Sequence, residues 1–177
     1  MGPGVGNHVV CYCVDCQAFA AFLGTPGITD DAGGTALFQM PRSQVRITEG
    51  LDQLRCVRLS PTGMHRWYAD CCKTPIGNTL TAGMPFIGLI DTCVAVPESE
   101  RAEQLGAAVG MHGSQAKGKA PSGVHPKVPA SFILRAAPKF AKWLLLRKGS
   151  PSPFFDARGA PHVAPKVLNK EERDALR

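Results

Sequence analysis

The sequence predicts an all-β core followed by a basic, partly helical extension. Short apolar segments separated by turn residues fill the first half of the chain, and their spacings leave no room for crossover helices, which favours antiparallel strands. The formal charge changes from −1 over residues 1–94 to +7 over residues 95–177. All seven cysteines lie in the first part and nine of the fifteen prolines in the second. We therefore expect a folded domain over residues 1–96 and an extension over residues 97–177.

The expected core elements follow from alternation and turn chemistry. Val45 and Ile47 alternate with polar neighbours, as do Val57 and Leu59, which is typical of half-buried strands. Glycine, proline and aspartate supply turns between them. A short apolar helix is expected at 18–24, followed by strands at 35–40, 44–50, 54–60, 63–69 and 85–96.

The extension has the pattern of two helices joined by a flexible linker. The first helix is expected near 98–110, and a Gly-, Pro- and Lys-rich linker follows at 113–129. The second helix is expected near 138–148, because Pro138 suits a first helical position and Gly149 a position just after a helix.

The composition narrows the class of protein. A hydrophobic content of 44% describes a globular chain, and no apolar run approaches the roughly 18 residues that cross a bilayer. The first ten residues show none of the marks of a signal peptide. An odd number of cysteines fits metal ligation or free thiols better than a disulfide framework, so we expect a cytoplasmic protein with reduced thiols.

The segment CYCVDCQ, residues 11–17, carries the strongest chemical signal. Cys11, Cys13 and Cys16 fall within six residues. Such spacing places three soft thiolates round one ion, and zinc takes thiolates in tetrahedral sites. Three protein ligands with an open place make a reactive site, whereas four thiolates make a structural one.

The candidates for a fourth ligand are Cys71 and Cys72. Neighbouring side chains diverge in extended backbone, so we expect only one of the two to ligate. Cys56 and Cys93 lie in strand-like segments and are expected to be core residues.

Together, CYCVDCQ and the later SPTGMHRWYADCCKTPI resemble the zinc proteins typified by glutathione-dependent formaldehyde-activating enzyme and centromere protein V, over about residues 8–96. The resemblance implies a β-tent of antiparallel strands with a catalytic zinc at Cys11, Cys13 and Cys16. It matches Cys72 to a further zinc ligand, with Cys71 as its substitute. The early Cys-x-Cys of that family is absent, so we expect about one zinc rather than two.

This resemblance also implies an activity. The zinc would hold a substrate thiolate, of glutathione or another small thiol, for carbon–sulfur bond chemistry on glutathione–aldehyde adducts, a lyase reaction. Arg66 would clamp a substrate carboxylate, for which its planar fork is suited; the alternative for this arginine is a surface salt bridge.

A second function class is a non-catalytic, zinc-stabilised binding module whose basic extension contacts a partner or a membrane surface. Within residues 133–148, Arg135, Lys139 and Lys142 share one helical face, as a membrane-surface helix would have them. The alternative is a helix packed on the core with its lysines in water. No nucleic-acid motif is present.

Overall fold

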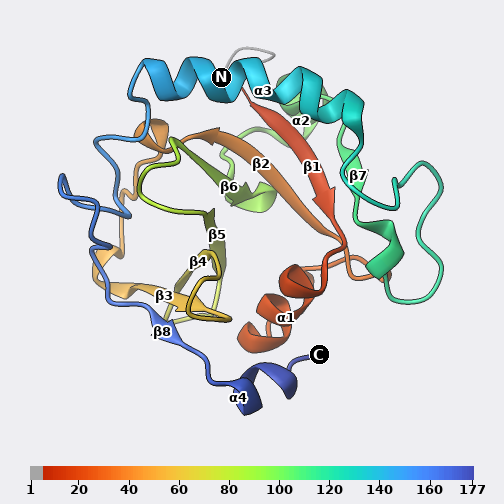
Figure 1. The fold of residues 1–177 in the computed structure, drawn as a ribbon, viewed down its shortest axis with the longest axis horizontal. Coiled ribbons are helices and arrows are strands. Elements are labelled where there is room, and N and C mark those ends of the chain that lie inside the picture. The colour runs from red at the N-terminus through yellow and green to blue at the C-terminus, as the bar shows by residue number, and fades with distance from the viewer. Residues whose placement is uncertain (1–5) are drawn as a thin grey trace.

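The structure is a computed structural model and describes residues 6–177. The first five residues, half of the segment expected not to be a signal peptide, lie outside the described residues. Within the described residues, eight strands form one mixed sheet in the order β7-β1-β2-β6-β5-β4-β3-β8 (Figure 1). The fold is mostly β, as predicted. The strands are β1 (Asn7–Cys11), β2 (Thr35–Pro41), β3 (Leu54–Arg58), β4 (His65–Ala69), β5 (Pro75–Thr79), β6 (Phe86–Ile90), β7 (Val109–Met111) and β8 (Lys166–Val167).

The sheet is antiparallel in its middle and parallel at both edges. The neighbouring strands β1, β2, β6, β5, β4 and β3 all pair antiparallel. At one end of the β1–β2 pair, Cys11 is opposite Thr35. The edge strand β7 pairs with β1 in parallel, and β8 pairs with β3 in parallel. The expectation of a purely antiparallel core is therefore wrong at the edges, because distant segments of the chain return to close them.

Several local predictions differ from the structure. Residues 44–50 form no strand; a single 3₁₀ turn spans Arg42–Gln44, and Val45 and Ile47 pack half-buried against the core without a ladder. The strands β1, β5, β7 and β8 were not predicted, and β7 begins at the end of the segment 98–110 that was expected to be a helix. The strand β5 was missed partly because its sequence, PIGNT, contains proline and glycine, which are poor strand formers.

The four helices of the described part of the chain lie outside the sheet. The helix predicted near 138–148 begins earlier, and Pro138 lies inside it rather than at its first position. None of the described helices is long and apolar enough to cross a membrane. Their bounds are α1 (Val14–Leu23), α2 (Glu98–Leu105), α3 (Ala130–Leu145) and α4 (Lys170–Asp174).

Residues 97–177 contribute to the core as well as to the surface. The chain beyond the predicted boundary at residue 96 supplies both edge strands. Phe154 and Phe155 are buried beside Trp67, at 5.0 and 5.7 Å between ring centroids. Removal of this segment would expose the apolar centre of the sheet.

A separate apolar cluster leads from the sheet to the cysteines. Buried side chains of β1, β2, β6 and β7 pack there against Phe132 and Ala136 of α3. Cys11 and Cys16 belong to the same cluster. The cysteine loop is thus continuous with packed core rather than a surface appendage. The strand residues are Val9, Leu37, Ile90 and Met111.

Candidate metal centre

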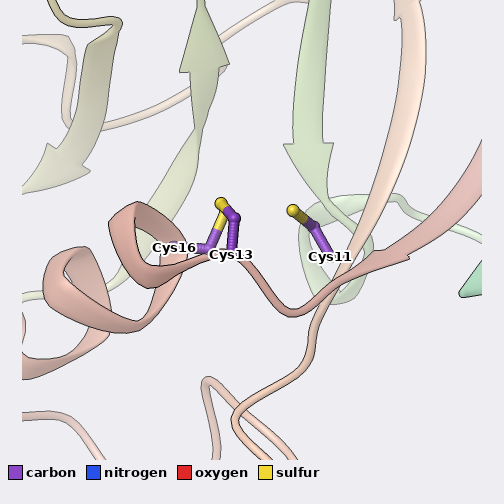
Figure 2. A group of neighbouring side chains, drawn as sticks. All are labelled: Cys11, Cys13 and Cys16. Atoms are coloured by element: carbon purple, nitrogen blue, oxygen red, sulfur yellow. The ribbon is translucent and has the colours of Figure 1, made fainter. Parts of the chain in front are cut away.

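Three cysteines meet where β1 ends and α1 begins. Cys11 is the last residue of β1, Cys13 precedes the first turn of α1, and Cys16 lies within that turn. Their sulfur atoms all lie within 4.8 Å of one another and on the same side of the connecting loop (Figure 2). This spacing can hold one metal ion. Among the described residues, the group contains no fourth cysteine and no histidine, aspartate or glutamate.

The helix start shapes the electrostatics of the cluster. The amides of Cys16 and Gln17 donate to the carbonyl oxygen of Cys13, at 3.0 and 3.2 Å. A helix N-terminus carries partial positive charge, which favours thiolates near it. Hydrogen bonds from Cys11 and Cys16 lower the pKa of Cys13, whereas the hydrogen bond to Cys13 raises the pKa of Cys11. The pKa of Cys16 is also raised, so Cys13 is the thiol of the group that ionises first.

A buried arginine faces the sulfurs. Arg66, on β4, is only 2% exposed, and its Nη1 lies 4.0 Å from the Sγ of Cys16. The same nitrogen donates to Oδ1 of Asn78 at 3.2 Å, and the guanidinium lies over the ring of Phe19. No salt bridge joins Arg66 to a carboxylate within residues 6–177. In that set of contacts, the Sγ of Cys16 is the only atom near Arg66 that can carry a negative charge.

Thr35 adds an unsatisfied hydroxyl beside the cluster. It is directly opposite Cys11 in the β1–β2 register, so the two side chains share one face of the sheet. Its Oγ1 is buried and has no hydrogen-bond partner in the structure. Unsatisfied buried polar groups are rare in folded proteins, and each calls for a ligand, an ion or a water.

The cysteine loop is fixed by residues far along the chain. Gln17 donates from Nε2 to the carbonyl oxygens of Tyr12 and Gln115, at 2.7 and 2.8 Å. The amide of Val14 donates to Oε1 of Gln115, and the amide of Tyr12 donates to Met111. These hydrogen bonds were not predicted, because nothing in the local sequence marks Gln17 or Gln115 as a residue that holds the cysteine loop.

The structure does not bring the vicinal cysteines to this group. Cys71 and Cys72 are exposed on the turn between β4 and β5, with their sulfur atoms 3.6 Å apart. The Sγ of Cys72 lies 2.9 Å from Oγ1 of Thr74. Neither belongs to the set of ligand atoms within 4.8 Å of one another.

The remaining two cysteines have different environments. Cys56 is buried in the apolar core, as expected, and burial raises the pKa of its thiol to about 12. Cys93 is not the core residue that was predicted: it is exposed, and its thiol donates to the carbonyl oxygen of Pro75 at 3.1 Å.

Comparison with known proteins corrects the resemblance drawn from the cysteine motifs. No curated protein and no solved structure matches the chain. One family model, described as a family of unknown function, DUF6151, matches residues 1–165, and the formaldehyde-activating enzyme family does not match. The earlier assignment is therefore wrong. A Cys-x-Cys-x-x-Cys loop is short enough to arise in unrelated metal proteins, and the other cysteine pairs of that family are incomplete here. By the extent of this match, the chain belongs to the DUF6151 family.

Proposed function

We propose that this protein is a zinc-stabilised binding module in which Cys11, Cys13 and Cys16 hold the ion. The observation that carries the proposal is the pairing of three clustered sulfurs with Arg66, a buried cation that has no carboxylate partner within the described residues. Zinc suits thiolate ligands and a four-coordinate site.

The charges of such a centre balance. A divalent ion with three thiolates has a net charge of −1, and the guanidinium of Arg66 supplies +1 beside it. A buried charge without compensation costs several kcal/mol, so a buried arginine facing three thiols would be unfavourable. Arg66 would therefore stabilise the anionic zinc–thiolate centre, and that centre would compensate the buried charge of Arg66.

The surroundings favour a role in stability over one in turnover. Cys11 and Cys16 are buried and belong to an apolar cluster that includes two residues of α3. A cavity of about 540 Å³ is lined by residues such as Val10, Asp30 and Thr92, and no cysteine lines it. The ion would join the end of β1 to the start of α1, and the binding surface would be supplied by the basic residues 97–177.

One observation favours a second candidate, a reactive metal site that binds a small thiol. The cluster offers three protein ligands, and Oγ1 of Thr35 lies unsatisfied beside Cys11. The fourth ligand of the ion would be water in the binding module and an incoming thiolate in the reactive site. Because Thr35 is opposite Cys11, either ligand would lie near the hydroxyl of Thr35. The two candidates differ in whether that position accepts an outside thiol.

Cobalt substitution separates the candidates. Thiolate-to-cobalt charge-transfer bands change when a further sulfur enters the coordination sphere. In the binding module, burial of Cys11 and Cys16 keeps outside thiols from the ion, so millimolar glutathione leaves the spectrum of the cobalt protein unchanged. A shifted spectrum, which means that glutathione sulfur has entered the coordination sphere, would replace the module with the reactive site.

The variant Thr35→Val tests the role of this hydroxyl, because valine keeps the shape of the side chain and removes the hydroxyl. If Thr35 hydrogen-bonds the fourth ligand, zinc affinity falls by about tenfold, as is usual for groups that orient metal ligands. The equivalent change at Thr79, a buried threonine whose Oγ1 accepts from Trp67 instead, leaves zinc affinity unchanged.

A further inference from the structure

The helix α3 exposes an apolar face to solvent. It runs along one edge of the molecule, beside the start of β1, where Lys139 donates to the carbonyl oxygen of Gly6 at 2.7 Å (Figure 1). Leu134 and Leu145 are 76% and 83% exposed. Single exposed leucines are ordinary, but a contiguous patch of them marks an interaction surface. The large apolar residues of this patch are Ile133, Leu134, Leu144, Leu145 and Leu146.

Basic side chains border the same patch. Arg135 and Lys142 are exposed and seven residues apart, so they share one edge of α3. Arg147 and Lys148 follow directly after the helix. No acidic residue occurs between Glu103 and Asp156. The patch is thus apolar at its centre and positive at its border.

The opposite face of α3 is firmly packed, which fixes the exposed face outward. Phe132, Ala136 and Trp143 are buried. Phe140 stacks on Phe86 of β6 at 4.5 Å and contacts Trp143 edge-on at 5.3 Å. Because these side chains already attach α3 to the rest of the fold, the exposed leucines on its other side cannot pack into the core.

We propose that α3 docks this protein on an anionic membrane surface. The helix lies parallel to the surface, its leucines enter the boundary between headgroups and acyl chains, and Arg135 and Lys142 contact lipid phosphates. Amphipathic helices with lysine and arginine beside an apolar face bind membranes in this way, and anionic lipids attract each basic residue. This inference names the partner of the proposed binding module and rests on that function, but not on the zinc.

Charge favours a membrane over a second copy of the chain. Two copies meeting through this patch would bring the basic borders of both helices together, which is unfavourable. An anionic lipid surface complements both parts of the patch. Nucleic acid would pair with the basic border alone and would leave the exposed leucines without a role.

A cavity continues the patch at the C-terminal end of α3. It has a volume of about 230 Å³, and its lining includes Leu144 and Arg147. It is also lined by Arg42, which is 3% exposed and whose guanidinium donates to the carbonyl oxygens of Thr81 and Ala82. The lining also includes Asp156, whose Oδ1 accepts from the amides of Arg158 and Ala160. Two arginines against this one carboxylate leave the cavity positive beside its apolar rim, which suits the phosphate of a lipid headgroup.

The test is sedimentation of the full, zinc-loaded chain with vesicles. Phosphatidylcholine vesicles containing about one third phosphatidylserine should bind the protein, pure phosphatidylcholine vesicles should bind it weakly, and added salt should reduce binding. Leu134→Asp with Leu145→Asp should lower the vesicle partition coefficient by at least about tenfold, and Arg135→Glu with Lys142→Glu should do the same. Leu51→Asp is the matched control, because Leu51 is 55% exposed outside α3.

Each outcome decides for or against the proposal. Equal binding to both kinds of vesicle, no binding to either, or an equal loss in Leu51→Asp overturns it. So does a dimer in size-exclusion chromatography that the Leu134→Asp, Leu145→Asp variant converts to monomer. Nucleic-acid binding that responds to the charge reversals and not to the leucine changes overturns it as well.

Zinc content measured on the same samples keeps the two proposals apart. A chain that holds zinc but ignores anionic vesicles removes the membrane as the partner and leaves the metal centre standing. A chain that binds anionic vesicles without zinc removes the metal centre and leaves the docking surface. Circular dichroism of each variant confirms that α3 is retained.

Discussion

Replacement of Arg66 by methionine tests the charge balance at the cysteine cluster. Arg66 is 2% exposed, and its Nη1 lies 4.0 Å from the Sγ of Cys16. At an effective dielectric constant of about 20, unit charges 4.0 Å apart interact by about 4 kcal/mol. The charge of the metal centre is spread over the ion and three sulfurs, so the mean separation is larger, about 7 Å, and the interaction is about 2 kcal/mol.

The expected result is a loss of zinc affinity. A difference of about 2 kcal/mol corresponds to about thirtyfold in the dissociation constant. The assay is a competition titration in which a chromophoric chelator takes zinc from the protein at fixed pH. Arg66→Lys keeps the charge but lacks the planar fork that also binds Asn78, so its affinity should lie between those of wild type and Arg66→Met.

Two results would refute this reasoning. Arg66→Met with wild-type zinc affinity would mean that the arginine does not compensate the centre. An equal loss in Arg55→Met, which removes a half-exposed arginine of the neighbouring strand, would mean that overall charge and not the contact is responsible. Thermal unfolding of the zinc-loaded variants excludes a general loss of the fold.

Four further changes have defined outcomes. Cys11→Ser should abolish stoichiometric zinc and lower the unfolding temperature, because bound zinc contributes to folding; full zinc with unchanged melting would contradict the site. Cys71→Ser should leave zinc content unchanged, because this exposed thiol lies outside the cluster, and a loss of zinc on elemental analysis would argue otherwise. Gly77→Ala should cost about 2 kcal/mol in urea unfolding, since its Cβ would lie 2.7 Å from a carbonyl oxygen of β6; wild-type stability would show that the sheet yields. Burial holds the pKa of His65 below its ordinary value, so the unfolded chain takes up a proton first and stability falls as the pH drops through about 6.5. His65→Phe should weaken that fall when unfolding is compared at about pH 5 and about pH 7.5, and an unchanged pH dependence would assign it to other groups.

The central strands were predictable because their signal is local. Val57 is fully buried in β3, as its alternation with polar neighbours predicted. In β4, the segment HRWYA lies within a strand expected between turns at 63–69, and four of its five residues are buried, including His65 and Arg66. The local sequence pattern therefore predicted these strands, but it did not predict that their polar residues are buried.

The edges of the sheet were not predictable, because their strands are defined by distant partners. β7 contains only Val109–Met111, and it becomes a strand by pairing with β1, about a hundred residues earlier. β8 is shorter still and pairs with β3. Three-residue and two-residue segments have no periodicity to read, so only the folded chain reveals them.

The start of α3 was misplaced for a different reason. Proline is common at the first position of a helix, which led to a predicted start at Pro138. The structure begins the helix at Ala130, after Pro129, and the burial of Phe132 and Ala136 anchors its first turns. Packing of the apolar residues before Pro138 outweighs the cost of a proline inside the helix, about 3 kcal/mol.

The candidate site was predictable in its ligands and not in its surroundings. Three cysteines within six residues can be read from the sequence alone, and the structure brings them together. The expectation that an arginine in Arg66's position pairs at the surface or with a substrate came from residue type. Its burial against Cys16, and the position of Thr35 opposite Cys11, depend on strand register and could not be read locally.

The most direct test of the central claim is the metal content of the purified full chain. Elemental analysis by mass spectrometry, on protein prepared without added metal or chelator, should find about one zinc per chain, in keeping with a single group of three thiolates. Cys13→Ser, prepared in parallel, should contain far less zinc. A wild-type chain without bound metal, with a different metal in stoichiometric amount, or with zinc that survives Cys13→Ser would contradict the account.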